Sequence, residues 1–412
     1  MLPSRRTYSF GFPTSTFLLI TTFVLTACGG GRSGSDGGTS TSSASNSSAA
    51  ALSDIAELGK QIFFDTTLSA SGVQSCATCH VASRAHAGND DLAVPFGGSG
   101  FKTTGFRNAP SLNYMLATPE FFFDKEGTPT GGFDRDGRAN TLALQAERPF
   151  LSDHEMANVT KAKVAEKLAS AAYVSEFRRI YGAGIFDNPD DAFNRATMAL
   201  MQFEREDASF GTFDSKFDYF IKGKVRLSDQ ELRGYALFNN PVKGNCAGCH
   251  PSTRADGNPA LFTDFTYDNL GVPRNFDIPA NADASYYDLG LCGPDRTDLV
   301  ADHPDLCGAF KVPTLRNIAL TAPYFHNGKF KTLRDVVSFY VRRDTNPEEW
   351  YPVGANGIEK FNDLPLEYRG NVNVTEVPYN RKPGDLPALD SDEIDDLVAF
   401  LNTLTDGYTL GK

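Results

Sequence analysis

Several common features are missing from this sequence, and each absence narrows the class of protein. Beyond residue 27 no apolar run is long enough to span a bilayer, so we expect no membrane-spanning helix there. Alternation of apolar and polar residues is scarce, which disfavours a β-rich fold. Basic residues are in the minority, with 39 Lys and Arg against 51 Asp and Glu, and the formal charge of −12 disfavours nucleic acid as a partner. A basic protein partner remains open.

The composition that is present suits a large, mainly helical protein. The 412 residues are 41% hydrophobic and 12% aromatic, enough for two or three packed domains. Ser228 with Glu231, and Asp390 with Glu393, have the spacing of capping boxes that begin helices. Apolar residues fall on one face of a helix in the 160–181 region and again after residue 390; they are Val164, Leu168, Ala171, Ala172 and Ile180, then Ile394, Leu397, Val398, Leu401 and Leu404.

The N-terminus predicts export and attachment to a membrane through a lipid. Arg5 and Arg6 precede a short apolar stretch (17–25), which ends in Leu-Thr-Ala-Cys28. This resembles a bacterial lipobox, in which the cysteine is lipidated; cleavage beside an incidental cysteine is the alternative. We therefore predict a lipoprotein signal peptide over 1–27, a Gly/Ser-rich tether over 28–52, and a periplasmic location with Cys28 as the anchor.

Four of the seven cysteines form two CxxCH motifs, Cys76–His80 and Cys246–His250. The two thiols of such a motif can add to the two vinyl groups of a haem, which leaves the adjacent histidine under the iron. His80 and His250 are therefore the predicted iron ligands, and the predicted attachment points are Cys76, Cys79, Cys246 and Cys249. A zinc site or a redox dithiol is the alternative, but zinc needs four comparable ligands and the second pair lies 170 residues away.

Two more cysteines, Cys292 and Cys307, lie 15 residues apart in a segment rich in Gly, Pro and Asp. In an oxidising compartment they predict a disulfide, with two free buried thiols as the alternative. The four histidines outside the motifs are interpreted as surface or supporting groups; they are His86, His154, His303 and His326.

A weak internal repeat surrounds the two motifs. Gly59-Lys-Gln-Ile-Phe63 precedes the first motif and Gly234-Tyr-Ala-Leu-Phe238 precedes the second, each as a short helix leading into an attachment loop. The predicted fold class is therefore all-α: two c-type cytochrome-like domains, loop-rich, each around one covalently bound haem. The predicted bounds are 53–224 for the N-terminal haem domain and 225–412 for the C-terminal haem domain.

Three further segments resemble the bacterial di-haem cytochrome c peroxidase superfamily. They are Arg-Asn-Ala-Pro-Ser-Leu (107–112), Asp-Gly-Arg-Ala (136–139), and the stretch 313–328, which contains Pro-Thr-Leu-Arg-Asn and Ala-Pro-Tyr-Phe-His-Asn-Gly. The resemblance covers roughly residues 53–405 and implies a haem-dependent oxidoreductase of the peroxidase type.

Within the superfamily the pattern is similar to the MauG-like branch. Tyr340 stands where the peroxidases usually place a methionine that binds the second haem. A thioether favours reduced iron, whereas an anionic phenolate favours oxidised iron. The second haem would then share oxidising equivalents instead of accepting electrons from a cytochrome. A core tyrosine with a different sixth ligand is the alternative.

The resemblance also implies an open, peroxide-reactive first haem on His80. Gln145, Pro149 and Glu155 keep the spacing of the family's distal segment. Glu155, with a pKa near ~4.3 and hence ionised at neutral pH, would be the acid–base group. Gln145 would hydrogen-bond the bound oxygen, and Pro149 would restrict the space over the iron. For Glu155 the alternative is an ordinary acid near a helix start.

The family holds a calcium ion between its haems, and the resemblance maps the ligands to Asn108, Thr321 and Pro323. One departure concerns Arg135, which replaces a tryptophan that the family carries between the haems. A guanidinium cannot relay an electron hole, so either another aromatic residue bridges the irons or their coupling is weaker. The single tryptophan, Trp350, is a candidate surface relay, with packing as the favoured interpretation.

The C-terminal run and the Cys292–Cys307 segment resemble the methanobactin-associated MbnH subgroup, whose members oxidise a tryptophan of a partner protein. The sequence thus predicts an enzyme that uses hydrogen peroxide to form a high-valent di-haem state and to oxidise a side chain of a partner protein. The alternatives are a di-haem cytochrome c peroxidase supplied with electrons by a small cytochrome, and an electron-transfer cytochrome without catalysis.

Overall fold

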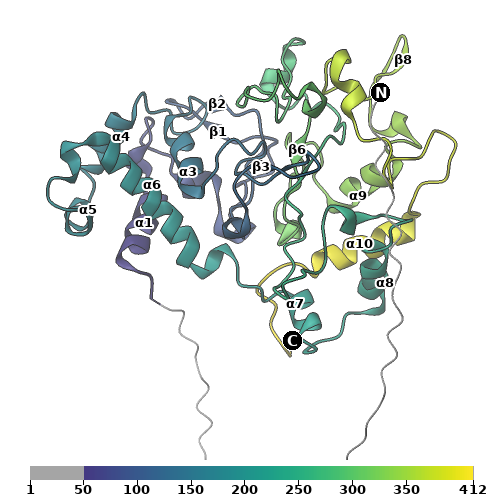
Figure 1. Ribbon diagram of the computed structural model, residues 1–412, viewed down its shortest axis with the longest axis horizontal. Coiled ribbons are helices and arrows are strands. Elements are labelled where there is room, and N and C mark those ends of the chain that lie inside the picture. Colours follow the sequence, from purple (N-terminus) through teal and green to yellow (C-terminus); the bar gives the residue numbers. More distant parts are fainter. Residues whose placement is uncertain (1–50, 412) are drawn as a thin grey trace, which may run out of the picture. The chain divides into compact units, whose positions relative to one another are not determined.

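The computed structural model describes residues 51–411, so the predicted signal peptide and nearly all of the predicted tether lie outside the described residues. Helices and loops make up most of the described chain (Figure 1). The α-helices are α1 (Asp54–Phe64), α2 (Cys76–Cys79), α3 (Leu142–Leu151), α4 (Lys161–Leu168), α5 (Val174–Tyr181), α6 (Pro189–Glu206), α7 (Lys216–Ile221), α8 (Asp229–Phe238), α9 (Leu333–Arg342) and α10 (Ser391–Asn402). Within the described range, none of these helices has the length and apolar character needed to cross a membrane.

Short strands and 3-10 helices occupy the loops between the α-helices. The strands form four antiparallel pairs: β1 (Phe96–Gly97) with β2 (Thr103–Thr104), β3 (Phe122–Phe123) with β4 (Pro129–Thr130), β5 (Tyr267–Asp268) with β6 (Phe310–Lys311), and β7 (Val353–Gly354) with β8 (Gly357–Ile358). The 3-10 helices are Thr66–Leu68, Ala82–Arg84, Met115–Ala117, Ile185–Asp187, Ala208–Phe210, Cys246–Gly248, Pro279–Ala282, Pro304–Leu306, Ile318–Leu320, Pro347–Glu349 and Leu366–Asn371. The expectation of an all-α fold did not include the four strand pairs.

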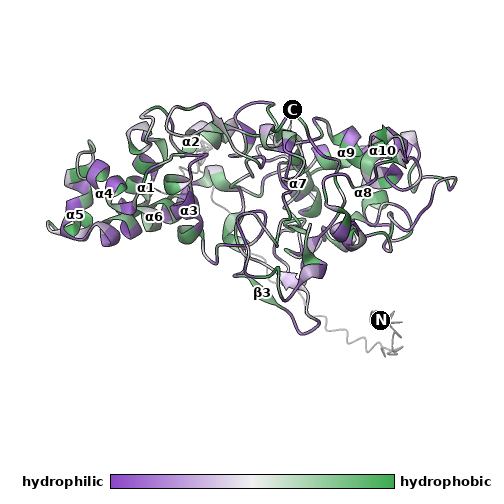
Figure 2. Ribbon diagram, turned by 90° about the horizontal axis from the view of Figure 1, so that it is seen from above, coloured by the Kyte–Doolittle hydropathy of each residue, from purple (hydrophilic) through white to green (hydrophobic). Residues whose placement is uncertain are grey.

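Two separate hydrophobic cores organise the described residues. The first is built by α1, α3, α4, α5 and α6 and contains Phe63, Phe177 and Phe193, all essentially inaccessible to solvent. The second is built by α7, α8, α9 and α10 and contains Phe238 and Phe400. The helices of both groups carry green apolar and purple polar residues on the same ribbon in Figure 2, as amphipathic helices do.

The change from one core to the other occurs between Phe210, in the first core, and Phe217, in the second. Helix α7 therefore packs with the second core, although the predicted boundary at 224/225 assigns it to the N-terminal domain. Both cores belong to one compact unit of the chain. The division into two haem domains stays a prediction.

The repeated Gly-x-x-x-Phe segment has a structural reason in each core. Helix α1 crosses α6 at Gly59, where an added Cβ would lie 1.9 Å from the backbone oxygen of Ala199. Helix α8 crosses α10 at Gly234, where an added Cβ would lie 2.0 Å from the backbone oxygen of Asp396. The glycine thus lets two helix backbones approach closely, while the phenylalanine four residues later fills the core.

The two predicted capping boxes are confirmed, because Ser228 and Asp390 are the N-caps of α8 and α10 and form reciprocal bonds with Glu231 and Glu393. The single helical face expected in the 160–181 region is wrong in one respect. The chain turns between Ala169 and Tyr173, which divides the region into α4 and α5. This turn brings residues on both sides of it into the first core.

Candidate functional site

His80 is held by a neighbouring backbone carbonyl. It follows α2 directly, and its ring Nδ1 lies 2.8 Å from the backbone oxygen of His86, to which it donates in the neutral tautomer. Burial is the main cause that lowers the pKa of His80 to about 4, so the ring is neutral at neutral pH. Its Nε2 therefore keeps a free lone pair, as an iron ligand requires.

His250 repeats this arrangement in the second half of the chain. It follows the 3-10 helix at Cys246, and its Nδ1 donates to the backbone oxygen of Phe262 at 2.7 Å. Burial lowers the pKa of His250 as well. The two CxxCH motifs thus present the same histidine tautomer with the same free nitrogen.

A second loop supports each acceptor carbonyl in the same manner. The Ser111 hydroxyl donates to the backbone oxygen of Ala85 at 2.5 Å, and the Thr314 hydroxyl donates to that of Leu261 at 2.6 Å. Each hydroxyl therefore fixes the residue that precedes an acceptor. The acceptors themselves, His86 and Phe262, both have left-handed backbone, with φ of 51° and 54°.

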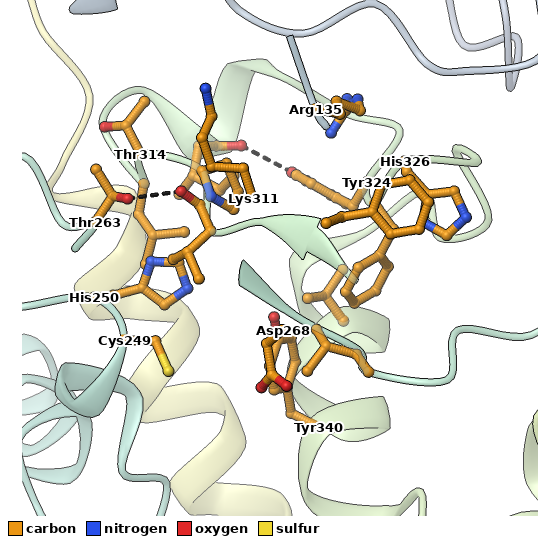
Figure 3. Close-up of a pocket in the computed structure, with 18 of the residues that line it drawn as sticks. Arg135, Cys249, His250, Thr263, Asp268, Lys311, Thr314, Tyr324, His326 and Tyr340 are labelled. Atoms are coloured by element: carbon orange, nitrogen blue, oxygen red, sulfur yellow. Dashed lines mark hydrogen bonds between the residues drawn. The ribbon is translucent and has the colours of Figure 1, made fainter. Parts of the chain in front are cut away.

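A cavity of about 490 Å³ adjoins the second motif. Cys246, Cys249 and His250 line it together with Tyr340 of α9. Figure 3 shows Cys249 and His250 on one side of this cavity and Tyr340 with Asp268 on the other. Tyr340 and His250 thus line one cavity, and the role of Tyr340 as an iron ligand stays a prediction.

The donor groups fit two covalently attached haems. Within the described residues, the thiols of both CxxCH motifs are free of disulfides, while Cys292 and Cys307 form the predicted one. Each motif offers two thiols for thioether bonds and one neutral histidine nitrogen for the iron. The cavity at the second motif is large and mainly apolar, as the macrocycle requires.

The Tyr340 ring packs between Phe325 and Tyr379, at centroid distances of 5.8 and 6.0 Å. Burial, followed by the charges of Cys249 and Asp268, raises the pKa of Tyr340 above its ordinary value. An ionised Tyr340 therefore requires a compensating positive charge in the cavity, such as a ferric iron.

Glu155 lies close enough to the first motif for its charge to be the second cause, after burial, that raises the pKa of the Cys79 thiol to about 12. Its backbone oxygen accepts hydrogen bonds from the Gly98 amide, at 2.7 Å, and from the Gln74 side chain. Glu155 is an exposed residue, although the surrounding protein partly desolvates its carboxyl. Burial, with Asp134 as the second cause, raises the pKa of Glu155 to about 7. The expected pKa near ~4.3 is therefore wrong, because it assumed a fully solvated carboxyl.

Gln145 and Pro149 both belong to α3, the helix that precedes Glu155. Gln145 lines the cavity at the second motif, as do Asp134 and Arg135, whereas its predicted role is at the haem of the first motif. The Pro149 backbone oxygen accepts from the Met156 amide at 2.9 Å, which fixes the turn that carries Glu155. The distal roles of these residues stay predictions.

The three predicted calcium ligands, Asn108, Thr321 and Pro323, line the same cavity. However, Asn108 is already engaged. Arg135 donates from Nε to the Asn108 backbone oxygen and from Nη2 to Asn108 Oδ1, both at 3.0 Å. A cation therefore sits where the family resemblance expects a calcium ligand to be free.

The remaining histidines take supporting or surface positions. The His86 ring stacks on Phe210 at 4.0 Å, and the His326 ring stacks on Phe310 at 3.8 Å. His154 is exposed, and His303 stacks on Phe123 at 4.6 Å.

Trp350 makes edge contacts with Phe330 and Phe339, each at a centroid distance of 5.7 Å. Its indole Nε1 is enclosed and has no hydrogen-bond partner among the described residues. These contacts agree with the packing interpretation. A relay role for Trp350 stays a hypothesis.

The sequence did not predict several residues that shape the site. The carbonyls of His86 and Phe262 act through the backbone, which leaves no side-chain signal. Asp134, on a loop, influences Glu155, and Asp268, in β5, influences Tyr340; each acid is distant in sequence from the residue it acts on. The similarity between Pro110-Ser111-Leu112 and Pro313-Thr314-Leu315 was a detectable signal for the supporting loops.

Proteins similar to this chain are found both by sequence and by structure. A sequence model described as di-haem cytochrome c peroxidase matches residues 53–226. The methylamine utilization protein MauG of Paracoccus denitrificans is 36% identical over 368 residues, which cover 85% of this chain and 88% of that protein.

Two solved structures are also similar. The diheme peroxidase BthA from Burkholderia thailandensis has a TM-score of 0.79 and 39% identity, and the match covers 86% of each chain. A MauG-like protein associated with microbial copper homeostasis has a TM-score of 0.62 and 26% identity, over 87% of this chain and 91% of that one. Of these two structures, BthA is the more similar to this chain in both TM-score and sequence identity. The assignment to the MbnH-like subgroup therefore stays a prediction.

Proposed function

Because the chain belongs to the di-haem cytochrome c peroxidase family, which includes MauG, we propose that it uses hydrogen peroxide to oxidise a side chain of a partner protein. The family is one of haem-dependent oxidoreductases and implies two haem c groups. We further propose that the enzyme works in the periplasm and is anchored through a lipid on Cys28. When bound, the haem groups supply the redox-active irons at which the peroxide O–O bond is broken.

The observation that carries this proposal is the place of Tyr340 in the cavity that contains His250. A tyrosine oxygen on that side favours oxidised iron, which is suited to holding oxidising equivalents. A methionine thioether would instead favour reduced iron and electron entry from a donor cytochrome. A di-haem cytochrome c peroxidase supplied by a donor cytochrome is therefore the second candidate function.

Glu155 is the proposed acid–base group at the first motif. Its carboxylate takes a proton from one peroxide oxygen and returns it to the departing oxygen. A pKa of about 7 suits both steps at neutral pH, because the carboxylate and the acid are present in comparable amounts. Gln145 orients the peroxide by a hydrogen bond, and Pro149 limits the space beside it.

The overall reaction balances with a two-electron donor. The partner side chain gives up two electrons and two protons, and one hydrogen peroxide becomes two water molecules. An aromatic side chain, such as tryptophan, is the proposed substrate group because it can lose electrons one at a time. The acidic surface of this chain favours a partner with a basic docking face.

The test is to add one equivalent of hydrogen peroxide to the purified oxidised holoprotein and to follow its absorption spectrum. The proposal expects a rapid change at both haems without any prior reduction. Reaction only after one haem has been reduced would favour the cytochrome c peroxidase. Absence of any reaction would leave an electron carrier and would contradict both enzymatic readings.

A further inference from the structure

Arg135 lines the cavity at the second CxxCH motif, at the end of the pocket far from Cys249 (Figure 3). Its guanidinium makes two hydrogen bonds to one residue, through Nε to the Asn108 backbone oxygen and through Nη2 to Asn108 Oδ1. Asn108 is buried, and its backbone amide donates to the backbone oxygen of His326 at 2.7 Å. Both oxygens of Asn108 therefore face a cation.

The surrounding acids do not neutralise this cation. Asp136 and Asp288 form ion pairs with Arg107, both at 2.6 Å, and Asp134 pairs with Arg138 at 3.3 Å. The Arg135 guanidinium, which is protonated at any physiological pH, has no carboxylate within ion-pair distance among the described residues.

The other predicted calcium ligands have a cation beside them too. The Arg84 guanidinium donates to the backbone oxygen of Ala322, which lies between Thr321 and Pro323. The carbonyls of Thr321 and Pro323 themselves accept no hydrogen bond within residues 51–411. A divalent ion bound there would meet Arg135 across a shared Asn108 oxygen, and two cations on one oxygen repel each other.

We propose that the Arg135 guanidinium takes the place of calcium at Asn108, so that this protein holds no calcium ion between its two haem sites. Arg135 supplies a permanent positive charge and two directed bonds where an exchangeable ion would otherwise bind. The segment 107–110 is then fixed by the chain itself. The single substitution of arginine for the family's tryptophan at position 135 then also accounts for the loss of calcium.

The test measures calcium in the purified holoprotein after dialysis against metal-free buffer, together with the thermal midpoint with and without chelator. We expect well below one calcium per chain and a midpoint that chelator does not change. Arg135→Gln removes the charge and frees the oxygens of Asn108, which lines the same cavity as Thr321 and Pro323. This variant should take up calcium and should be stabilised by calcium chloride.

Arg233→Gln is the matched control, because Arg233 is an exposed arginine that pairs with Asp396 far from the cavity. Stoichiometric calcium in the wild-type protein, or a midpoint lowered by chelator, would overturn the proposal. A calcium response of Arg135→Gln equal to that of Arg233→Gln would overturn it as well. If Arg135→Gln does not fold, the calcium content and chelator response of the wild type decide. Neither readout uses peroxide, so the result is independent of the proposed enzymatic activity.

Discussion

At the scale of single residues, backbone carbonyls fix the two candidate iron ligands. His80 and His250 each donate Nδ1 to a carbonyl that belongs to a residue with left-handed backbone. Such a bond sets the tautomer and the ring orientation together, and it makes Nε2 more basic. Neither bond depends on an acid that a change of pH could protonate.

Glu155→Gln should slow the reaction with peroxide by about 10²–10⁴-fold, because a glutamine cannot accept and return the proton. In the wild type the rate should rise with pH through about 7, since burial raises the pKa of Glu155 and only the carboxylate accepts a proton. Stopped-flow absorbance over pH 5–9 measures both effects. Glu147→Gln is the control on α3, because Glu147 pairs with Lys161 instead. An unchanged rate in Glu155→Gln would remove Glu155 from the mechanism.

Tyr340→Met should raise the reduction potential of the second haem and slow the peroxide reaction of the fully oxidised protein. The physical reason is that a neutral thioether stabilises reduced iron relative to an anionic phenolate. Spectroelectrochemical titration measures the potential, with Tyr379→Phe as the control for a neighbouring ring. If the potential of Tyr340→Met equals that of the wild type, Tyr340 is not a ligand.

At the scale of secondary-structure elements, two close helix crossings build the cores. In each of the pairs α1–α6 and α8–α10, a glycine at the equivalent position of the repeat lies at the crossing point. Each pair also carries the segment that leads into a CxxCH motif. The position of each motif thus depends on a helix crossing that tolerates no side chain at one point. This is why the repeat keeps glycine and phenylalanine while the residues between them differ.

Gly59→Ala and Gly234→Ala should each lower the free energy of unfolding by about 1–3 kcal/mol. An alanine Cβ would lie within 2.0 Å of a helix backbone oxygen, so the helices must separate. Gly100→Ala is the control, because it is exposed and an added Cβ there meets nothing within 4 Å. Urea unfolding of the holoproteins measures the difference. Equal stability of all three variants would contradict the observed crossings.

At the scale of the whole molecule, Arg316 joins distant parts of the chain. It is buried, pairs with Asp218 of α7 at 2.5 Å, and lies over the rings of Tyr114 and Phe213. Tyr114 also donates to Asp406, near the C-terminus, at 2.5 Å. These contacts connect the loops of the first half with α7 and the end of the chain.

Asp218→Asn should therefore destabilise the protein by about 3–5 kcal/mol, because it leaves the charge of Arg316 buried without a partner. Asp395→Asn is the control, since the Asp395–Arg334 pair is exposed and should contribute at most about 1 kcal/mol. Urea unfolding at neutral pH compares the two. A loss below that of the control would show that the buried pair is not needed.

The same pair predicts an acid limit to stability. Although burial acts to raise the pKa of Asp218, hydrogen bonding and the charge of Arg316 lower it overall. The stabilisation is present above the ordinary pKa of about 3.9 and is lost as pH falls through the lower pKa of the folded state. Thermal midpoints of the wild type should fall in this range more steeply than those of Asp218→Asn. Parallel curves would contradict this assignment.

The sequence by itself determined the local chemistry of this protein. The spacing of Cys76, Cys79 and His80, the caps at Ser228 and Asp390, and the repeated glycine act within a few residues, so their meaning did not depend on the fold. Family resemblance then placed Tyr340 near the second motif, where the structure also has it.

Only the tertiary structure decided what those groups experience. The pKa of Glu155 depends on the desolvation of its carboxyl by the surrounding protein and on Asp134, which lies on another loop. The bonds from Arg135 to Asn108 join residues 27 positions apart, and those from Arg316 to Asp218 join residues 98 apart. Burial and long-range charge pairing arise when distant segments meet, and no local pattern contains that information.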